Sequence, residues 1–259
     1  LHLSIRRQRQ MCIRDSHFHQ VTTDSAGRMA GNPLKGRVFK EEHLDWSGSF
    51  ARAETEWEAP LIDRARFPRV KSFTQTLLDG PAPQATRKRF AYDDARTPRA
   101  GNVVQIVDEG DVSISGDERT EEFQYALPVS GGGAGFPSSH LVTGAGFRSE
   151  TEFRYDGLTA GQVSRGNVTM LRRWLDQPAP ARWLETGVLY NSSGQVVRVT
   201  DALGNSASTI YDAQGFPVSE TNRAGHLSTR IFDLRTGEPL SVTDPNLQTL
   251  SLIHISEPT

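Results

Sequence analysis

The sequence has little cysteine, no long apolar run and almost no net charge. Its 259 residues include one Cys. No stretch approaches the roughly 18 consecutive apolar residues of a membrane-spanning helix, which argues against an integral membrane protein. The formal net charge is −2. The composition therefore does not indicate the strongly basic surface on which nucleic-acid binding usually depends. With 23 Gly and 14 Pro, the composition predicts a globular chain rich in turns rather than a coiled coil or a disordered chain.

Both ends resemble translated sequencing adapter. Residues 6–15 read RRQRQMCIRD, the peptide encoded by an adapter joined to a transposase mosaic end; residues 250–259 read LSLIHISEPT, which the opposite strand of that mosaic end encodes. We expect residues 1–16 and 250–259 to be non-native and disordered or unpacked, and both natural termini to be missing. A basic N-terminal arm is the alternative. Because Cys12 lies in the first segment, we expect no disulfide and no thiol nucleophile.

An internal repeat occupies the last third of the chain. Tyr190, Tyr211 and Phe232 are each 21 residues apart. An Asp or Asn with a Gly shortly after it recurs about every ten or eleven residues, both directly after these aromatic residues and midway between them. The pairs are Asn191 with Gly194, Asp201 with Gly204, Asp212 with Gly215, Asn222 with Gly225 and Asp233 with Gly237, followed by Asp244, where Asn246 replaces the Gly.

The spacing has a physical reason. An Asp or Asn side chain that begins a turn accepts backbone N–H groups further along, and a Gly at positive φ then closes a hairpin. Between the turns, apolar and polar residues alternate as they do in strands. Glycine at this density is incompatible with helix. We therefore predict antiparallel hairpins with positive φ at each turn Gly, and the three aromatic residues stacked at equivalent positions along one wall.

The pattern Tyr-Asp-x-x-Gly, with its partner Thr-Asp-x-x-Gly, resembles the YD repeats of the Rhs family and of the Tc-toxin B and C components. The resemblance is specific over residues 186–249, although Asn191 and Phe232 depart from the expected Asp and Tyr. It is looser at Tyr155-Asp156 and at Tyr92-Asp93, which looks like a repeat widened by an insertion. The organisation expected between the adapter-like ends is an irregular β-rich region with degenerate repeats over residues 17–150 and YD repeats over residues 151–249. Within residues 17–85, the segments 36–38 and 55–57 resemble the stretch that precedes the repeats in Tc-toxin-like, SpvB-type chains.

The resemblance implies an all-β fold in which antiparallel hairpins spiral as part of a hollow β-cocoon shell. In that family the shell encloses a C-terminal effector, usually a toxin. For this chain it implies a structural role without catalytic residues or cofactors. The implied partners are its own C-terminal effector domain and other toxin-complex subunits, not nucleic acid, and the implied location is secreted or on the bacterial surface. The alternative is a YD-repeat surface protein that binds carbohydrate or another cell.

Other residues that carry chemistry are better explained without a site. An acidic stretch has carboxylates suited to calcium but lacks the spacing of an EF-hand, so a solvated loop is favoured. Two histidines beside the first adapter-like segment, and a Ser-Ser-His run, are too isolated to indicate a metal site or a triad. Scattered tryptophans are more often packing anchors than sugar platforms. These candidates are Asp108, Glu109, Asp111, Asp117, Glu118, His17, His19, Ser138, Ser139, His140, Trp46, Trp57, Trp174 and Trp183.

Overall fold

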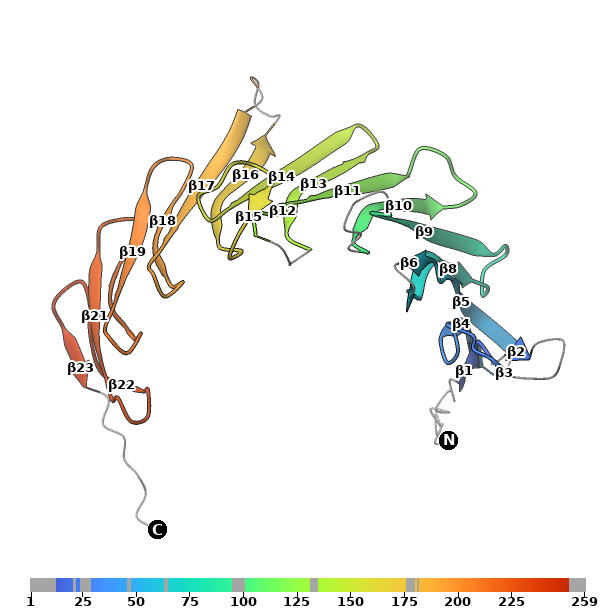
Figure 1. The fold of residues 1–259 in the computed structure, drawn as a ribbon, viewed down its shortest axis with the longest axis horizontal. Helices are drawn as coiled ribbons and strands as arrows, with labels where there is room; N and C mark the ends of the chain where they lie inside the picture. Colours follow the sequence, from blue (N-terminus) through green and yellow to red (C-terminus); the bar gives the residue numbers. More distant parts are fainter. Residues whose placement is uncertain are drawn as a thin grey trace, which may run out of the picture. The chain divides into compact units, whose positions relative to one another are not determined.

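The fold is an antiparallel β-sheet. The computed structural model describes residues 13–20, 22–23, 29–45, 48–62, 65–94, 101–130, 135–175, 180 and 182–251. Within these residues every regular element is a β-strand, and 17 strands belong to one sheet (Figure 1). The predicted all-β antiparallel class is confirmed. None of the described residues forms a helix long and apolar enough to cross a membrane.

The chain divides into two compact units whose sequences interleave. Unit 1 comprises residues 1–124 and 140–148, and unit 2 comprises residues 125–139 and 149–259. The exchange takes place within β11 (Arg119–Tyr125), β13 (Pro137–Gly144) and β14 (Phe147–Tyr155).

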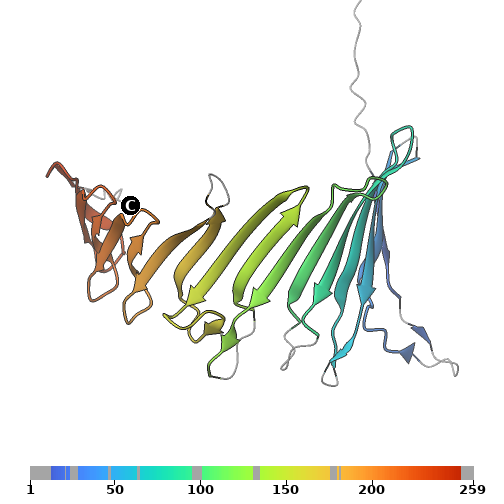
Figure 2. The same cartoon turned by 90° about the horizontal axis from the view of Figure 1, so that it is seen from above.

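Unit 1 is a meander in which each strand pairs with the next. The order is β1–β4–β5–β8–β9–β10–β11 (Figure 2). The bounds are β1 (Ile13–Phe18), β4 (Val38–Asp45), β5 (Gly48–Glu58), β8 (Arg69–Leu77), β9 (Gln84–Tyr92) and β10 (Val103–Asp111). Two connections contain small hairpins, β2 (Thr22–Thr23) with β3 (Met29–Ala30), and β6 (Leu61–Ile62) with β7 (Ala65–Arg66).

Cross-strand ion pairs connect the long strands of unit 1. Glu109 on β10 receives Arg87 at 2.6 Å and Arg89 at 2.5 Å, both from β9. Beside them, Lys88 lies 3.0 Å from Asp108. Pairs of this kind on an exposed sheet contribute little each, about 0–1 kcal/mol. The acidic residues of β10 thus form ion pairs with side chains of the neighbouring strand β9.

Unit 2 continues as a meander with shorter strands. From β14 the order is β16–β17–β18–β19–β20–β21–β22–β23, again antiparallel throughout. The bounds are β16 (Val168–Leu175), β17 (Arg182–Tyr190), β18 (Val196–Thr200), β19 (Ser206–Tyr211), β20 (Pro217–Thr221), β21 (Leu227–Phe232), β22 (Pro239–Thr243) and β23 (Thr249–Ser251). The short strands β12 (Leu127–Pro128) and β15 (Gln162–Val163) form a separate parallel pair.

The register of β18–β23 separates two chemically different faces, because directly paired residues share a face and neighbours along a strand do not. The first, here called the hydroxyl face, carries Arg198, Thr200, Ser206, Ser208, Ile210, Ser219, Thr221, Leu227, Thr229, Ile231, Ser241, Thr243, Thr249 and Ser251. The second, the anchor face, carries Val199, Ala207, Thr209, Tyr211, Glu220, Ser228, Arg230, Phe232, Val242 and Leu250.

Buried apolar residues are few among those described. One cluster in unit 2 contains Ala126, Tyr155 and Val163, with exposed fractions of 0%, 3% and 1%. Phe136 and Phe153 pack against it. The β12–β15 pair therefore covers part of β14 and β16, and among the described residues Val142 is the one other buried apolar side chain. Backbone pairing and turn contacts must then supply much of the stability.

The adapter-like ends correct one expectation. Residues 13–16 pair with β4, and Arg14 Nη2 lies 2.6 Å from Glu41 Oε1. Leu250 and Ser251 pair with β22, although Leu250 is 65% exposed. For residues 13–16 the expectation of disorder or of missing contacts is wrong, because an open sheet edge accepts any segment whose backbone reaches it. Leu250 is paired but is not deeply buried. The remaining adapter-like residues lie outside the described part, and the origin of both ends stays a prediction.

Candidate functional site: the repeat turns and their aromatic anchors

The turns of unit 2 share one geometry. In the turn after Tyr211, Asp212 Oδ1 accepts the backbone N–H groups of Gln214 and Phe216, both at 2.9 Å. The Gly215 N–H donates to the Asp212 carbonyl at 3.1 Å, and φ at Gly215 is 93°. The side chains of Asn191, Asp201, Asn222 and Asp244 make the same pair of contacts. The turn glycines Gly194, Gly204, Gly225 and Gly237 have φ of 81°, 87°, 81° and 76°.

The last two turns depart from this pattern in different ways. Gly237 N–H donates to the carbonyl of Asp233, four residues earlier, so this turn is one residue wider. In the final turn Leu247, at φ 66°, takes the left-handed position and donates to the Asp244 carbonyl. The alignment of the repeats in the sequence predicted that Asn246 takes the Gly position, and this prediction is wrong by one residue. A non-Gly residue in that conformation carries strain of about 1–2 kcal/mol.

Each repeat aromatic residue stands at a β-bulge and reaches back to the preceding hairpin. The register shifts just before Tyr190, which pairs with Val196, and just before Tyr211, which pairs with Pro217. The Tyr211 hydroxyl donates to the carbonyl of Val196 at 3.0 Å. The Tyr190 hydroxyl donates to the carbonyl of Val168 at 3.0 Å. Each hydroxyl therefore bonds the residue that pairs with the aromatic residue of the preceding repeat.

The same contact recurs outside the regular repeats. Tyr155 pairs with Val168 at a bulge, and its hydroxyl donates to the Pro137 carbonyl at 2.7 Å. In unit 1, Tyr92 donates to the Val70 carbonyl at 2.6 Å. Val70 is the bulge partner of Trp57, whose Nε1 donates to the carbonyl of Val38 at 2.7 Å; Val38 in turn pairs with Phe18 at a bulge. We call Phe18, Trp57, Tyr92, Tyr155, Tyr190, Tyr211 and Phe232 the aromatic anchors.

Sequence reasoning missed Trp57 and Phe18 as members of this series. The residues that follow them are Glu58 and His19 instead of Asp or Asn, and their connections are longer, so no fixed spacing relates them to the repeats. The usable signal was an aromatic residue that ends a strand before a turn. The expectation of one aromatic stack also needs correction: the Tyr190 and Tyr211 hydroxyls bond backbone carbonyls, whereas Phe232 stacks on Phe216, with ring centroids 5.0 Å apart.

An Asp after the anchor closes loops of different length. Asp93 Oδ1 accepts the Asn102 N–H at 3.0 Å, across a widened turn. Asp156 closes a longer loop, because its Oδ2 accepts the N–H groups of Ser164, Arg165 and Gly166 at 2.8, 2.9 and 3.1 Å. Its Oδ1 accepts the N–H of Asn167 at 3.0 Å. The carboxylate thus fixes the base of the loop regardless of the number of residues inserted above it.

These contacts shift the pKa of the capping carboxyls. For Asp156, desolvation raises the pKa, but the four backbone N–H groups lower it by more, and the net direction is downward. The pKa of Asp201 is also lowered, where backbone and side-chain hydrogen bonds from Asn205 outweigh desolvation. For Asp233, the hydrogen bonds of Arg235 lower the pKa. All three carboxyls act as charged acceptors.

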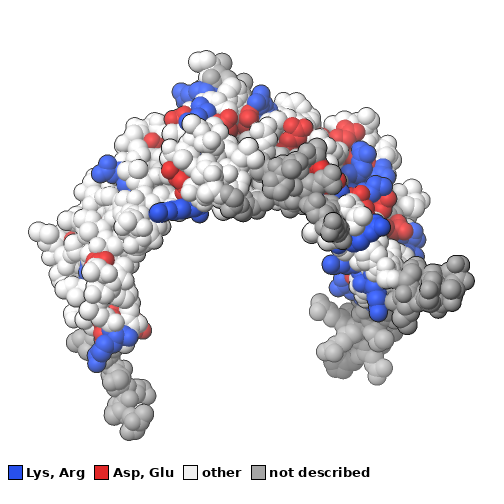
Figure 3. All heavy atoms as spheres, viewed as in Figure 1, with Lys and Arg blue, Asp and Glu red and all other residues white. Residues whose placement is uncertain are grey.

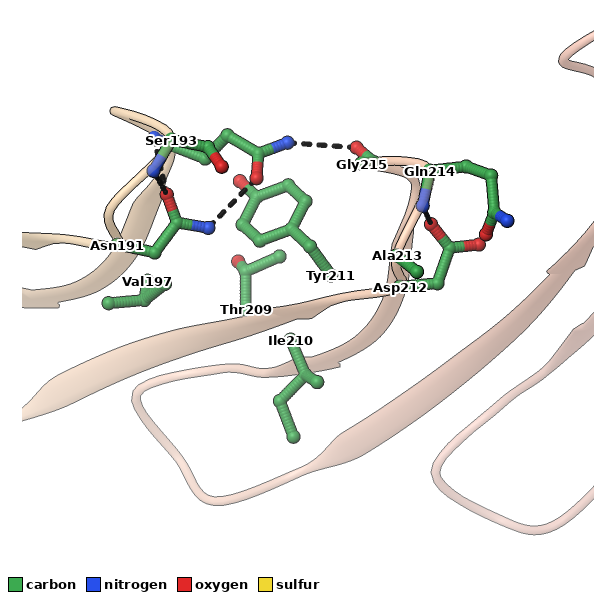
Figure 4. A pocket seen from close by; sticks show the side chains of 11 residues that line it. Asn191, Ser193, Val197, Thr209, Ile210, Tyr211, Asp212, Ala213, Gln214 and Gly215 are labelled. Carbon is green, nitrogen blue, oxygen red and sulfur yellow. Dashed lines mark hydrogen bonds between the residues drawn. The ribbon is translucent and has the colours of Figure 1, made fainter.

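A groove lies between the turns of two consecutive repeats. It has a volume of about 640 Å³ (Figure 4). Gln195 bridges the two turns, since its Oε1 accepts from Asn191 and its Nε2 donates to the Gly215 carbonyl at 3.0 Å. The groove offers amides, hydroxyls and the carboxylate of Asp212. Its lining comprises Asn191, Ser193, Gln195, Val197, Thr209, Ile210, Tyr211, Asp212, Ala213, Gln214 and Gly215.

The acidic stretch is engaged within the protein. Asp111 accepts the N–H and the hydroxyl of Ser113, which lowers its pKa, and Asp117 accepts the N–H of Asp111. Glu118 accepts the N–H of Gly116. In the part of the chain that the structure describes, no group of three or more His, Cys, Asp or Glu side chains is placed to hold a metal ion.

The remaining candidates have packing partners. His140 Nε2 lies 3.0 Å from Glu121 Oε2, and its ring stacks on Phe123. His17 lies 3.5 Å from Asp15 and 3.6 Å from Glu42. The His19 ring lies 5.0 Å from that of Phe39, centroid to centroid.

The structure brings two of the four tryptophans together. Trp174 and Trp183 pair across β16 and β17, with ring centroids 5.3 Å apart and planes at 67°. Arg172 covers the Trp183 ring at 4.7 Å. Trp57 is an aromatic anchor, and Trp46 lies outside the described residues.

Gly215→Val tests the turn geometry. Valine at φ 93° is strained, and its Cβ would lie 3.1 Å from Gln195 Nε2, so we expect a loss of at least about 1–2 kcal/mol in unfolding free energy. Gln214→Val, at the exposed neighbouring position, is the control and is expected to change stability by less than about 0.5 kcal/mol. Urea unfolding followed by tryptophan fluorescence measures both. Equal effects would contradict the assignment.

Tyr211→Phe tests the anchor contact. The substitution keeps the ring and removes the donor to the Val196 carbonyl, so we expect a loss of about 1 kcal/mol in unfolding free energy. Hydrogen exchange should also speed up at the β17–β18 hairpin that supplies this carbonyl. Unchanged exchange there would show that the hydroxyl does not couple the two hairpins.

Acid titration tests the role of Asp156. A carboxyl whose folded pKa is depressed contributes stability that is fully present above its unfolded pKa and is lost as pH falls through the folded value. We therefore expect unfolding free energy to decline below the ordinary pKa of 3.8, and the decline to be shallower in Asp156→Asn. Denaturant titrations between pH 2 and pH 7 measure the difference. An identical slope in the variant would exclude this carboxyl as a source of acid sensitivity.

Comparison with known proteins identifies the repeats. Residues 190–227 match the family model RHS Repeat. No curated protein matches the chain in sequence. Among solved structures, TcdB2-TccC3 matches 85% of this chain at a TM-score of 0.61 and 11% identity, and TcdB2-TccC3-TEV matches 85% at 0.61 and 10%. A Tc holotoxin pore of Photorhabdus luminescens matches 86% at 0.47 and 10%.

The solved chains are much longer than this one. The match covers 16% of the TcdB2-TccC3 and TcdB2-TccC3-TEV chains and 17% of the holotoxin chain. The two matches with a TM-score of 0.61 establish a shared fold, and at these identities they establish no more than that. The family match falls on the turns where Asn191, Asp201, Asp212 and Asn222 cap backbone N–H groups. Residues 190–227 thus match the RHS Repeat model, and the sheet has the fold of the TcdB2-TccC3 structures.

Proposed function

We propose that this chain is part of the structural shell of a Tc-type toxin complex. In this proposal its sheet helps to enclose a C-terminal effector domain. The observation that carries the proposal is the coincidence of the RHS Repeat match, over residues 190–227, with a fold likeness over 85% of the chain. Secretion or a bacterial surface location follows from the same proposal.

The side chains of the repeat support a structural role over a catalytic one. One oxygen of each turn carboxylate, which could have served as base or metal ligand, is committed to backbone N–H groups, as at Oδ1 of Asp201 and of Asp212. The anchor hydroxyls are committed to backbone carbonyls. We infer that the repeat residues hold the sheet and do not act on a substrate.

The sheet also has the physical character expected of a wall. Its described strands form one layer with a small buried cluster, so both faces can contact other material. Each hairpin pairs with the next through backbone hydrogen bonds, which lets a long sheet grow by repetition. We propose other toxin-complex subunits as further partners.

Carbohydrate binding by a YD-repeat surface is the second candidate function. The groove between the turns of Asn191 and Asp212 favours it, because amides and hydroxyls suit a polyhydroxylated ligand. The Trp174–Trp183 pair favours it less, since Arg172 already occupies one ring face. A glycan array with immobilised chain separates the two: retention that Gln195→Ala abolishes supports the second function.

Protease protection in the assembled complex tests the shell proposal. The effector should resist a protease in the complex made with the unmodified full-length chain. It should become sensitive with Gly194→Val plus Gly215→Val, because two strained turns open the wall. Gln214→Val is the matched control and should retain protection. An effector digested equally fast in the unmodified complex and in free form would exclude enclosure.

A further inference from the structure

We propose that the hydroxyl face of β18–β23 is the face that contacts the enclosed polypeptide, and that the anchor face points away from it. The inference rests on the proposed shell function and adds the orientation of the wall. It commits to one occupant, a polypeptide of the same toxin complex. The match covers only 16% of the TcdB2-TccC3 chain, so a shell chain of that length would carry most of its residues outside this sheet.

The two faces differ in charge. On the hydroxyl face of these described strands Arg198 is the one charged residue. The anchor face carries Glu220 and Arg230, which form an ion pair at 2.7 Å. Charged atoms are sparse over β18–β23 on the side that Figure 3 presents. The hydroxyl face thus carries a single fixed charge, and its other side chains are neutral groups, which cost less to desolvate than charged ones.

Two pairs of hydroxyls on this face bond each other. Thr200 and Ser206 lie 2.8 Å apart across the β18–β19 ladder, and Thr243 and Thr249 lie 2.8 Å apart across β22–β23. A hydroxyl that already has a partner loses less when water leaves its surroundings. Such a face can therefore be covered without contributing matched hydrogen bonds to the material that covers it.

The same face exposes its aliphatic side chains. Ile210, Leu227 and Ile231 are 62%, 50% and 63% exposed, and they alternate with Ser and Thr along β19 and β21. On the anchor face of the same strands, Tyr211 and Phe232 are only partly exposed, and Phe232 is stacked on Phe216. Exposed aliphatic groups favour contact with apolar material. On the anchor face, the large side chains of Tyr211 and Phe232 already contact other residues of the sheet.

Adjacent residues on β21 provide a matched test. Ser228 lies on the anchor face and Thr229 on the hydroxyl face, and both carry a hydroxyl. Single variants Ser228→Cys and Thr229→Cys are made in a cysteine-free full-length chain and treated with a maleimide polyethylene glycol. Rates in the assembled complex are divided by rates in the isolated 259-residue chain, where both faces are open.

In the complex we expect the Thr229→Cys thiol to react about tenfold or more slowly than the Ser228→Cys thiol, because modification then requires opening of the wall. Slower reaction at Ser228→Cys would overturn the orientation while leaving the shell intact. Equal rates with a protease-resistant effector would overturn the face assignment alone. Equal rates with a protease-sensitive effector would overturn the proposed shell as well.

A second variant pair guards against an effect of the thiols themselves. A benzophenone amino acid at Ile210 should crosslink to the effector polypeptide on irradiation, whereas the same group at Thr209, on the opposite face, should not. Crosslinking from Thr209 and not from Ile210 would overturn the proposal independently of the labelling rates.

Discussion

The structure depends on one interaction: an Asp or Asn oxygen that accepts backbone N–H groups at the base of a turn. A one-layer sheet with a small buried cluster cannot rely on a hydrophobic core, so its hairpins must be defined locally. At Asp212 the side chain satisfies two N–H groups and Gly215 supplies the left-handed residue that closes the loop. Register follows, because the turn fixes which residues of the two strands face each other.

The aromatic anchors add the longer-range half of this arrangement. A capped turn fixes the two strands of one hairpin. It adds no contact to the preceding hairpin, which is then held only by the backbone hydrogen bonds between neighbouring strands. The Tyr211 hydroxyl supplies a further contact by donating a hydrogen bond to the carbonyl of Val196, and Trp57 does the same with the carbonyl of Val38. An indole and a phenol thus make the same contact to a backbone carbonyl in different sequence contexts. The series of anchor contacts therefore extends further along the chain than the regularly spaced sequence repeats do.

The hairpin turns could be predicted from the sequence, whereas the contacts between residues far apart in the chain could not. Spacing and turn chemistry were sufficient for the hairpins around Gly194, Gly204, Gly215 and Gly225, because each turn is specified within five residues. They were insufficient for Trp57, whose place in the anchor series depends on Val38, nineteen residues earlier. The final turn shows the same limit, since Leu247 takes the left-handed position against its own preference. Edge pairing of residues 13–16 was also unforeseeable, because it uses backbone groups that every residue has.

The backward reach of the anchors has a consequence for how such a sheet is synthesised. Each Tyr or Trp anchor donates to a carbonyl that lies earlier in the chain, as from Tyr190 to Val168 and from Tyr92 to Val70. A hairpin leaving the ribosome therefore finds its acceptor already in place and needs no residue still to be translated. Domains generally fold in the order of synthesis, and a sheet built by this rule can lengthen vectorially, one hairpin at a time.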